Sequence, residues 1–187
     1  MLEPKRTDRR AAGSGRPEGT ETRRTVVRLR IVLLEIVPPV WRRLEIPAQW
    51  TLRQLHGALR CAMGWSEGDA HRFRVGDALY GNTSEATPAR DSRWITLGDV
   101  AAKGAKSFRY EIVSGESWEH EVLIESWEEG RGVRANAVCL GGERVWPPES
   151  ADGPDAWVDG VDFLAADASK AAAFDLESLN RALARLG

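Results

Sequence analysis

The sequence predicts an α+β fold, in which one helix from the N-terminal half and two helices near the C-terminus pack on a mostly antiparallel sheet. Two observations carry this prediction. Several segments alternate apolar and polar residues, as half-buried strands do, and three others place apolar residues three or four positions apart, as amphipathic helices do. The chain has 187 residues, 42% hydrophobic and 29% charged, which fits one globular domain plus a tail.

The two ends of the chain differ in composition. Residues 1–24 are rich in Arg, Gly, Pro and Glu and contain no aromatic residue, so this segment cannot bury enough apolar area to offset the entropy lost on ordering. We therefore expect residues 1–24 to form a disordered tail and residues 25–187 to form a single domain.

Residues 25–37 predict the first strand, with alternate apolar residues on one face and Arg28 and Arg30 on the other. The Pro-Pro pair that follows ends the strand, because proline cannot donate to a sheet ladder. Residues 40–47, VWRRLEIP, predict a second strand.

The segment TLRQLHGALRCAMGW predicts the first helix. Thr51 and Gln54 have the spacing of a capping box, and Gly64 supplies a C-terminal stop. The apolar residues between them form a single stripe that we expect to face the sheet: Leu52, Leu55, Leu59 and Met63.

The remaining elements follow from the same patterns. Alternation predicts strands at residues 71–75 and 79–81 around a Gly-Asp turn, and the segment 81–93 is a polar surface loop. Residues 108–113 and 117–129 predict a long antiparallel hairpin, and residues 134–140 predict a strand behind it. Two helices, at residues 154–166 and 175–186, complete the chain.

Several pieces of the chain together resemble the Ri-plasmid Orf-three-like family over nearly all of residues 25–187. These pieces are PPVWRRLEIP, TLRQLHGALRCAMGW, AHRF, LYG, SWEHEV, WPPE and FDLESLN. The resemblance implies an α+β fold with a mostly antiparallel sheet and an association with plasmids or mobile elements. It implies no established biochemical activity.

The resemblance also assigns individual positions to the motifs of the family. Where the family often has cysteines around its Pro-Pro-Glu motif, this chain has Trp146 and Ala151, so no metal or redox role is expected there. The matching positions are Pro39, Trp41, Arg42, Leu55, His56, Met63, Gly64, Trp65, His71, Phe73, Gly81, Trp118, Glu119, His120, Pro147, Pro148 and Glu149.

The Trp-Glu-His sequence at residues 118–120 has the appearance of a catalytic pair. Adjacent residues of a strand point to opposite faces, so Glu119 and His120 cannot act as one acid–base pair unless a bulge intervenes. The sequence therefore favours His120 as a hydrogen-bonded core histidine and Glu119 as part of a solvated face.

The chain has three histidines on apolar faces, which could converge between the helix and the sheet, although the sequence leaves their convergence open. Such a cluster of His56, His71 and His120 would permit a metal site or a proton-transfer site, with Glu116 or Glu149 nearby. The spacings match no zinc or di-iron motif, so the sequence predicts no metal and no cofactor. The cluster nevertheless supports an alternative function, a metal-assisted or acid–base hydrolase.

Arginines on several strands form the other candidate site, a basic sheet face with an aromatic residue beside it. The opposite interpretation is that these arginines pair across strands with glutamates and bind nothing. The candidate binding residues are Arg28, Arg30, Trp41, Arg42, Arg72, Arg74 and Trp146; the candidate glutamate partners are Glu111, Glu119, Glu121 and Glu125.

No nucleophile elbow, phosphate-binding loop or dinucleotide fingerprint is present, so the sequence favours a non-enzymatic function. We expect a binding module that recognises a protein or nucleic-acid partner through a sheet face or through residues 144–154. Two cysteines and the lack of a long apolar segment predict a cytoplasmic protein without a membrane span.

Overall fold

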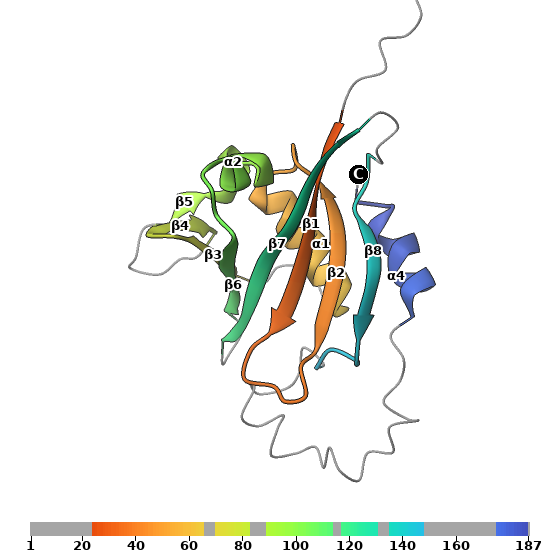
Figure 1. Ribbon diagram of the computed structural model, residues 1–187. Helices are drawn as coiled ribbons and strands as arrows, with labels where there is room; N and C mark the ends of the chain where they lie inside the picture. The colour runs from red at the N-terminus through yellow and green to blue at the C-terminus, as the bar shows by residue number, and fades with distance from the viewer. Residues whose placement is uncertain are drawn as a thin grey trace, which may run out of the picture.

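The computed structural model describes residues 24–65, 70–82, 89–113, 117–130, 135–147 and 175–186. These residues form an α+β fold in which one mixed sheet of eight strands is packed by helices (Figure 1). The fold class predicted from the sequence is thus confirmed. The predicted tail and the predicted helix at residues 154–166 lie outside the described residues, apart from Arg24, which begins the first strand.

The sheet has the strand order β5-β4-β3-β6-β7-β1-β2-β8. Every neighbouring pair is antiparallel except β4 and β5, which are parallel. The strands are β1 (Arg24–Leu33), β2 (Trp41–Pro47), β3 (Ala70–Val75), β4 (Ala78–Gly81), β5 (Arg90–Asp91), β6 (Ser107–Val113), β7 (Trp118–Gly130) and β8 (Val138–Glu143). The helices are α1 (Leu52–Met63), the 3-10 turn η1 (Ser92–Trp94), α2 (Leu97–Ala102) and α4 (Leu176–Leu183).

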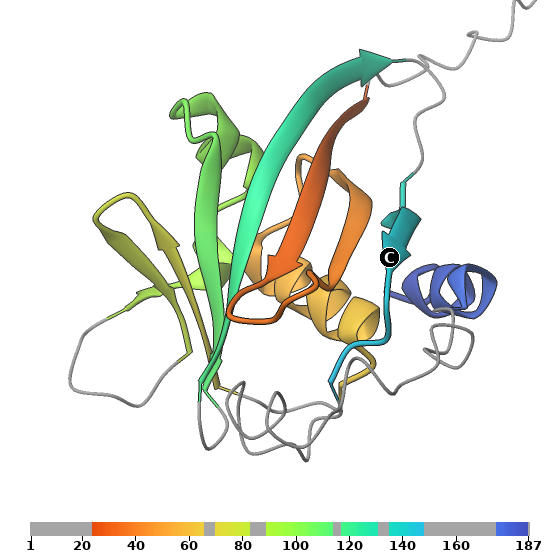
Figure 2. The same ribbon diagram turned by 60° about the horizontal axis from the view of Figure 1, so that its bottom comes forward.

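Helix α1 forms as the sequence predicted. The Thr51 hydroxyl accepts a bond from the Gln54 backbone N–H while the Gln54 side chain accepts from the Thr51 N–H, which completes the capping box. Gly64 ends the helix in the left-handed conformation, with φ of 75°. The predicted apolar stripe is buried, and the sheet curves around this helix (Figure 2).

The two faces of the sheet differ because side chains alternate along each strand. On β1, Leu29 and Ile31 are buried toward α1, whereas Arg28 and Arg30 lie on the opposite face. We call this opposite face, which carries the strand arginines, the open face. A bulge in β7 shifts its register against β1 between Arg28 and Leu29.

Strand β8 lies at an edge of the sheet, beside β2. The prediction of a strand behind the β6–β7 hairpin was therefore wrong about position, because strand order depends on long-range pairing that local alternation does not encode. Helix α4 packs on β8 through Asn180. The side-chain Oδ1 of Asn180 accepts from the Cys139 N–H at 2.7 Å, and its Nδ2 donates to the Cys139 carbonyl at 2.9 Å.

Helix α2 was missing from the sequence prediction. It has only six residues and begins with a capping box, in which Thr96 and Asp99 bond each other's backbone N–H groups. Isolated helices of this length are unstable in water, so only its packing holds it. In the described part of the chain, none of the helices has the length and apolar character needed to cross a bilayer.

Candidate functional site

Three histidines meet between α1 and the sheet. His56 lies on α1, His71 on β3 and His120 on β7, and all three are buried. The rings of His56 and His71 stack, with centroids 3.7 Å apart and planes inclined by 11°. Tyr110 of β6 links them to His120: its hydroxyl is 2.8 Å from His56 Nδ1, and its carbonyl accepts from His120 Nδ1 at 3.1 Å. We call His56, His71, Tyr110 and His120 the histidine cluster.

Aromatic side chains enclose the histidine cluster. Phe73 stacks on Tyr110 at 4.8 Å, and Trp146 stacks on His120 at 5.6 Å. Trp65 lies 5.8 Å from Trp118, and its Nε1 donates to the Pro147 carbonyl at 2.8 Å. The cluster is therefore part of the hydrophobic core, and Tyr110 supplies hydrogen-bond partners to His56 and His120 inside it.

Burial keeps two of the histidines, His56 and His120, neutral. It lowers the pKa of His56 to about 2, with further contributions from His71, Arg60 and Arg53. It also lowers the pKa of His120 to about 4, against the opposing effect of backbone hydrogen bonds at Tyr110 and Trp118. At neutral pH both imidazoles are uncharged, so neither serves as a cationic acid.

The three-histidine metal site that the sequence raised is not formed by the described residues. Ring nitrogens direct their lone pairs within the ring plane, so the stacked rings of His56 and His71 cannot both point at one ion. No group of three His, Cys, Asp or Glu residues within the described ranges is arranged to hold a metal. Glu116 and Glu149, the expected neighbours, lie outside these ranges.

Glu119 and His120 point to opposite sides of β7, as predicted. His120 is fully buried, whereas Glu119 is exposed on the open face, and its register partner on β6 is Glu111. The pair therefore has no shared acid–base geometry. His120 is a core residue, and its Nδ1 bond to a carbonyl satisfies one of its two ring nitrogens.

Three arginines of the open face are paired with glutamates. Arg72 donates two bonds to Glu111, at 2.8 and 3.0 Å, and Arg28 bonds Glu45 at 2.7 Å. Arg43 makes two bonds to Glu125, at 2.7 and 2.8 Å, and these bonds lower the pKa of that carboxyl. The sequence named Glu111 and Glu125 as partners. These pairs cancel much of the positive charge that a nucleic-acid surface would need.

The other predicted binding residues are arranged differently. The guanidinium carbon of Arg30 lies 4.7 Å from the Trp41 ring centroid, a cation–π contact on the open face. Arg74 is exposed on β3.

Arg42 and Trp146 are buried together, with the guanidinium 5.2 Å from the ring. Arg42 donates to the Trp41 and Glu143 carbonyls, and burial lowers its pKa to about 10. Because only 4% of Trp146 is exposed, its position offers little surface to a partner.

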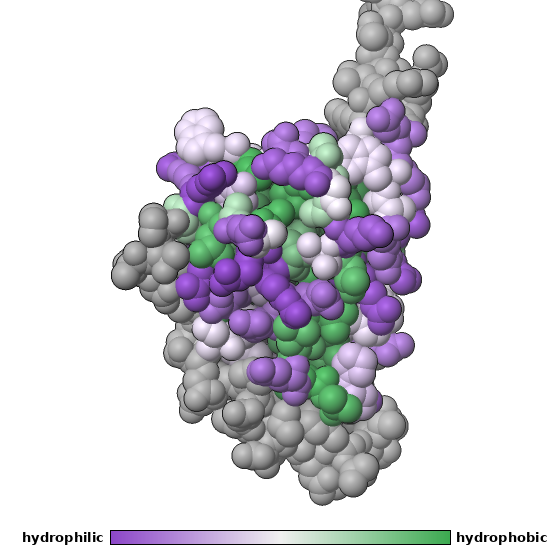
Figure 3. Space-filling view, turned by 60° about the vertical axis from the view of Figure 1, so that its left-hand side comes forward, coloured by the Kyte–Doolittle hydropathy of each residue, from purple (hydrophilic) through white to green (hydrophobic). Residues whose placement is uncertain are grey.

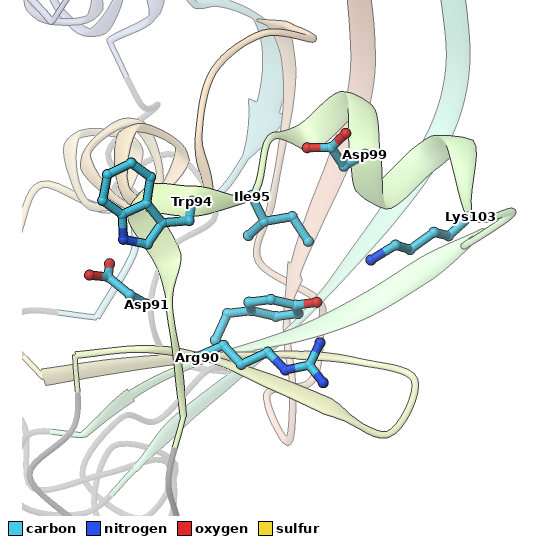
Figure 4. Close-up of a pocket in the computed structure, with 7 residues that line it drawn as sticks. Arg90, Asp91, Trp94, Ile95, Asp99 and Lys103 are labelled. Carbon is cyan, nitrogen blue, oxygen red and sulfur yellow. The ribbon is translucent and has the colours of Figure 1, made fainter.

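A surface pocket of about 400 Å³ lies between β4, β5 and α2, on the side of the molecule that Figure 3 brings forward. We call it the tryptophan pocket; it is lined by Tyr80, Arg90, Asp91, Trp94, Ile95, Asp99 and Lys103. Trp94 is 84% exposed, whereas Ile95 beside it is buried. Figure 4 shows Trp94 and Lys103 at opposite ends, with Ile95 between them.

The charged side chains around the tryptophan pocket differ in whether they form hydrogen bonds or ion pairs within the protein. Asp91 accepts bonds from the Arg93 guanidinium, the closest at 2.6 Å, and these bonds lower its pKa. The Asp99 carboxylate is held by the backbone N–H and hydroxyl of Thr96. Arg90 and Lys103, by contrast, form no ion pair within the described ranges.

A second pocket, of about 360 Å³, adjoins the first because both are lined by Asp91. We call it the side pocket; Arg53, Asn82 and Arg93 are among its lining residues. Together the two pockets bring four cationic side chains against two carboxylates. The four cations are Arg53, Arg90, Arg93 and Lys103, and the carboxylates are Asp91 and Asp99.

Sequence reasoning missed the tryptophan pocket. Its lining comes from three segments of the chain. The sequence predicted a polar loop at residues 81–93 and no element for Trp94, which follows that loop. One signal was present: Trp94 precedes the Thr96–Asp99 capping box by two residues, which places an aromatic side chain at the start of a helix. Its exposure could not be deduced, since tryptophan is most often packed in the core.

These observations define a class of protein: an α+β domain whose single curved sheet holds a buried helix on one side and a polar face on the other. A solved structure has this fold, the "Crystal Structure of Protein of Unknown Function MM3350 from Methanosarcina mazei Go1". The TM-score is 0.66 at 24% sequence identity, over 74% of this chain and 80% of that one. The likeness supports the fold alone.

Residues 25–180 match the family described as "Plasmid pRiA4b ORF-3-like protein", and the chain belongs to this family. A relative from Sinorhizobium fredii (strain NBRC 101917 / NGR234), "Uncharacterized protein y4hQ", is 33% identical over 156 residues. That match covers 82% of this chain and 80% of the relative. The family resemblance seen in the sequence is thus confirmed, and the printed names of these proteins state no activity.

Proposed function

We propose that this chain is a non-enzymatic binding module of a plasmid or mobile-element system, and that its protein or nucleic-acid partner contacts the tryptophan pocket. The observation that carries the proposal is Trp94, which is 84% exposed beside a pocket of about 400 Å³. Exposed tryptophans are common anchors of binding interfaces, because they bury a large area with few rotatable bonds. The name of the family supports the plasmid association.

The alternative, a metal-assisted or acid–base hydrolase, has less support. His56, His71 and His120 do gather in one cluster, but they are buried, and no histidine lines either of the two surface pockets described. A catalytic group must reach the reacting atoms of its substrate. The open face remains a second binding surface, with its unpaired cations reduced to Arg30 and Arg74 among the predicted arginines of β1 and β3.

A thermal-shift scan tests the proposal. We would scan the purified chain against duplex DNA, single-stranded DNA and RNA, mononucleotides, and zinc and manganese ions. A ligand that binds only the folded state stabilises it by about 2.7 kcal/mol at a hundredfold excess over Kd. We expect a stabilising ligand whose shift is lost in Trp94→Ala and kept in Trp127→Ala, the control at another exposed tryptophan.

The scan also separates the two functions. A shift with zinc or manganese that is lost in His71→Ala and kept in Trp94→Ala would favour the hydrolase. Because His71 is fully buried, its variant must be compared through the ligand-induced shift rather than through its own Tm.

A cytoplasmic location is part of the proposal. Cys61 and Cys139 are both free thiols, which suits a reducing compartment. Burial raises the pKa of both, so neither thiol is activated. Cell fractionation of the source organism would test the location directly.

A further inference from the structure

The tryptophan pocket combines one exposed aromatic ring with two exposed cations that form no salt bridge in the described ranges. We propose that it binds single-stranded nucleic acid, with a base stacked on Trp94 and backbone phosphates held by Arg90 and Lys103. This inference rests on the proposed function, because it names the partner of that same pocket.

The first step of the argument is charge. Both carboxylates of the pocket already accept hydrogen bonds from the chain, Asp91 from Arg93 and Asp99 from Thr96. The Arg93 guanidinium offsets the charge of Asp91, whereas Asp99, bonded by the neutral Thr96, keeps its charge and interacts with Lys103. Arg90 and Lys103 are exposed and form no salt bridge in the described ranges, so each can contact an incoming anion.

The second step is the aromatic ring. Proteins that bind single strands stack successive bases on exposed aromatic side chains beside a basic groove. Trp94 is the most exposed large hydrophobic residue described in this chain. A duplex keeps its base faces inside the stack, so Trp94 could stack on a base only if the strand were unpaired.

The third step is the arrangement of these groups. Trp94 and Lys103 lie at opposite ends of the pocket, with Ile95 between them (Figure 4). A single nucleotide would have to reach both ends at once, whereas a strand presents a base at one end and a neighbouring phosphate at the other. The side pocket continues the path past Asp91 toward Arg53 and Arg93.

The open face fits a strand less well. Three of its arginines, Arg28, Arg43 and Arg72, are held by glutamates, and Trp41 is occupied by its contact with Arg30. The chain as a whole has a formal net charge of −2, so attraction for phosphate must come from a local excess of cations. The two adjoining pockets supply such an excess, with four cations and two carboxylates.

Fluorescence anisotropy tests the inference with the full chain and labelled oligothymidylate or oligouridylate of about 12 nucleotides, a length within the usual site sizes. We expect saturable binding that Trp94→Ala weakens by about 5- to 150-fold, the loss typical of one stacked base. Trp94→Phe keeps a stacking ring and should lose less. The two oligonucleotides distinguish a DNA strand from an RNA strand as the source of the same chemistry.

The salt dependence tests the phosphate contacts. The slope of log K against log salt should fall by about 0.7 in Lys103→Gln and in Arg90→Gln, one phosphate contact each. Lys106→Gln is the matched control, because Lys106 is an exposed lysine outside the pocket, and its slope should equal that of the original chain.

Three results would overturn the inference. The first is binding that Arg30→Gln or Arg74→Gln weakens while the pocket variants do not. The second is an equal affinity for duplex and single strand. The third is no binding of either oligonucleotide; if polyglutamate then bound in a Trp94-dependent way, the binding module would stand with a different partner. Loss of every Trp94-dependent effect would overturn the proposed function as well.

Discussion

The histidine cluster and the tryptophan pocket differ in the burial and pairing of their polar and aromatic side chains. In the cluster the rings are buried against one another and His56 and His120 bond to Tyr110. In the pocket Trp94 is exposed and two cations have no ion pair among the described residues. The motif positions of the family include all three histidines, whereas Tyr80, in the piece LYG, is the one pocket-lining residue that falls in a family piece. Many of the residues that identify the family thus pack in the core of the domain, where a binding partner would not contact them.

Gly81 illustrates the packing role of a motif position. A Cβ atom at this residue would lie 2.1 Å from the His71 carbonyl oxygen, so only glycine allows β4 to approach β3 this closely. The position therefore serves the close pairing of β3 with β4.

The largest difference in the free energy of unfolding is expected between two tryptophan-to-alanine variants, one beside the histidine cluster and one in the tryptophan pocket. Trp118 is 1% exposed and contacts Trp65, so we expect Trp118→Ala to lower the free energy of unfolding by about 3–5 kcal/mol. Urea denaturation followed by far-UV circular dichroism measures this loss. A decrease below about 1 kcal/mol would contradict a tightly packed cluster.

Acid should destabilise the protein through the buried histidines. The folded pKa values of His56 and His120, about 2 and about 4, lie below the ordinary value of 6.5, so the unfolded chain takes up protons first. Stability is therefore complete above pH 6.5 and falls below it, by about 2 kcal/mol per histidine between pH 7 and pH 5. Urea midpoints at the two pH values measure the decrease.

The variant His120→Phe tests whether His120 contributes to this pH dependence of stability. His120→Phe keeps a ring among the aromatic side chains and removes one titrating group, so the stability lost between pH 7 and pH 5 should be smaller by about 2 kcal/mol. If the original chain and His120→Phe show the same pH dependence, the assignment to His120 is wrong.

Tyr110→Phe should have a smaller effect. The substitution removes the hydroxyl that lies 2.8 Å from His56 Nδ1 and leaves a buried ring nitrogen without that partner. We expect a loss of about 1–2 kcal/mol in the free energy of unfolding, within the range for a buried polar group left unpaired. Thermal and urea unfolding check the value, and an unchanged stability would show that the bond contributes nothing.

The smallest effect on stability is expected at the pocket. Trp94→Ala removes a ring that is 84% exposed, so the free energy of unfolding should stay within about 0.5 kcal/mol of the original value. The same urea experiment as for Trp118→Ala provides the comparison. A large loss would mean that Trp94 serves packing, and the contrast between the two regions would disappear.

Local patterns were enough to predict α1, the β6–β7 hairpin and the opposite orientation of Glu119 and His120. Each depends on neighbours in sequence: the Thr51–Gln54 capping box, the alternation along β7, and the turn between two apolar strands. The gathering of the three histidines was raised as a possibility from the apolar faces on which they lie, and it needed the structure to settle it, because it depends on long-range packing.

The positions of β8 and the tryptophan pocket could not be predicted in this way. Strand β8 pairs with β2 across about a hundred residues of chain, as the Arg42 bond to the Glu143 carbonyl illustrates with a separation of 101. The pocket needs β4, β5 and α2 to be placed together before Trp94 has a cavity beside it. Loop closure of this kind depends on the whole fold rather than on any one segment.

The two edges of the sheet are protected by different means. Strand β5 has only two residues and offers little backbone to another chain. Strand β8 is longer, but the Asn180 amide occupies both backbone groups of Cys139 in the way that a ninth strand would. Helix α4 therefore blocks this part of the β8 edge. Without Asn180, the Cys139 N–H and carbonyl would be free to pair with the edge strand of a second molecule, which would favour strand-mediated aggregation.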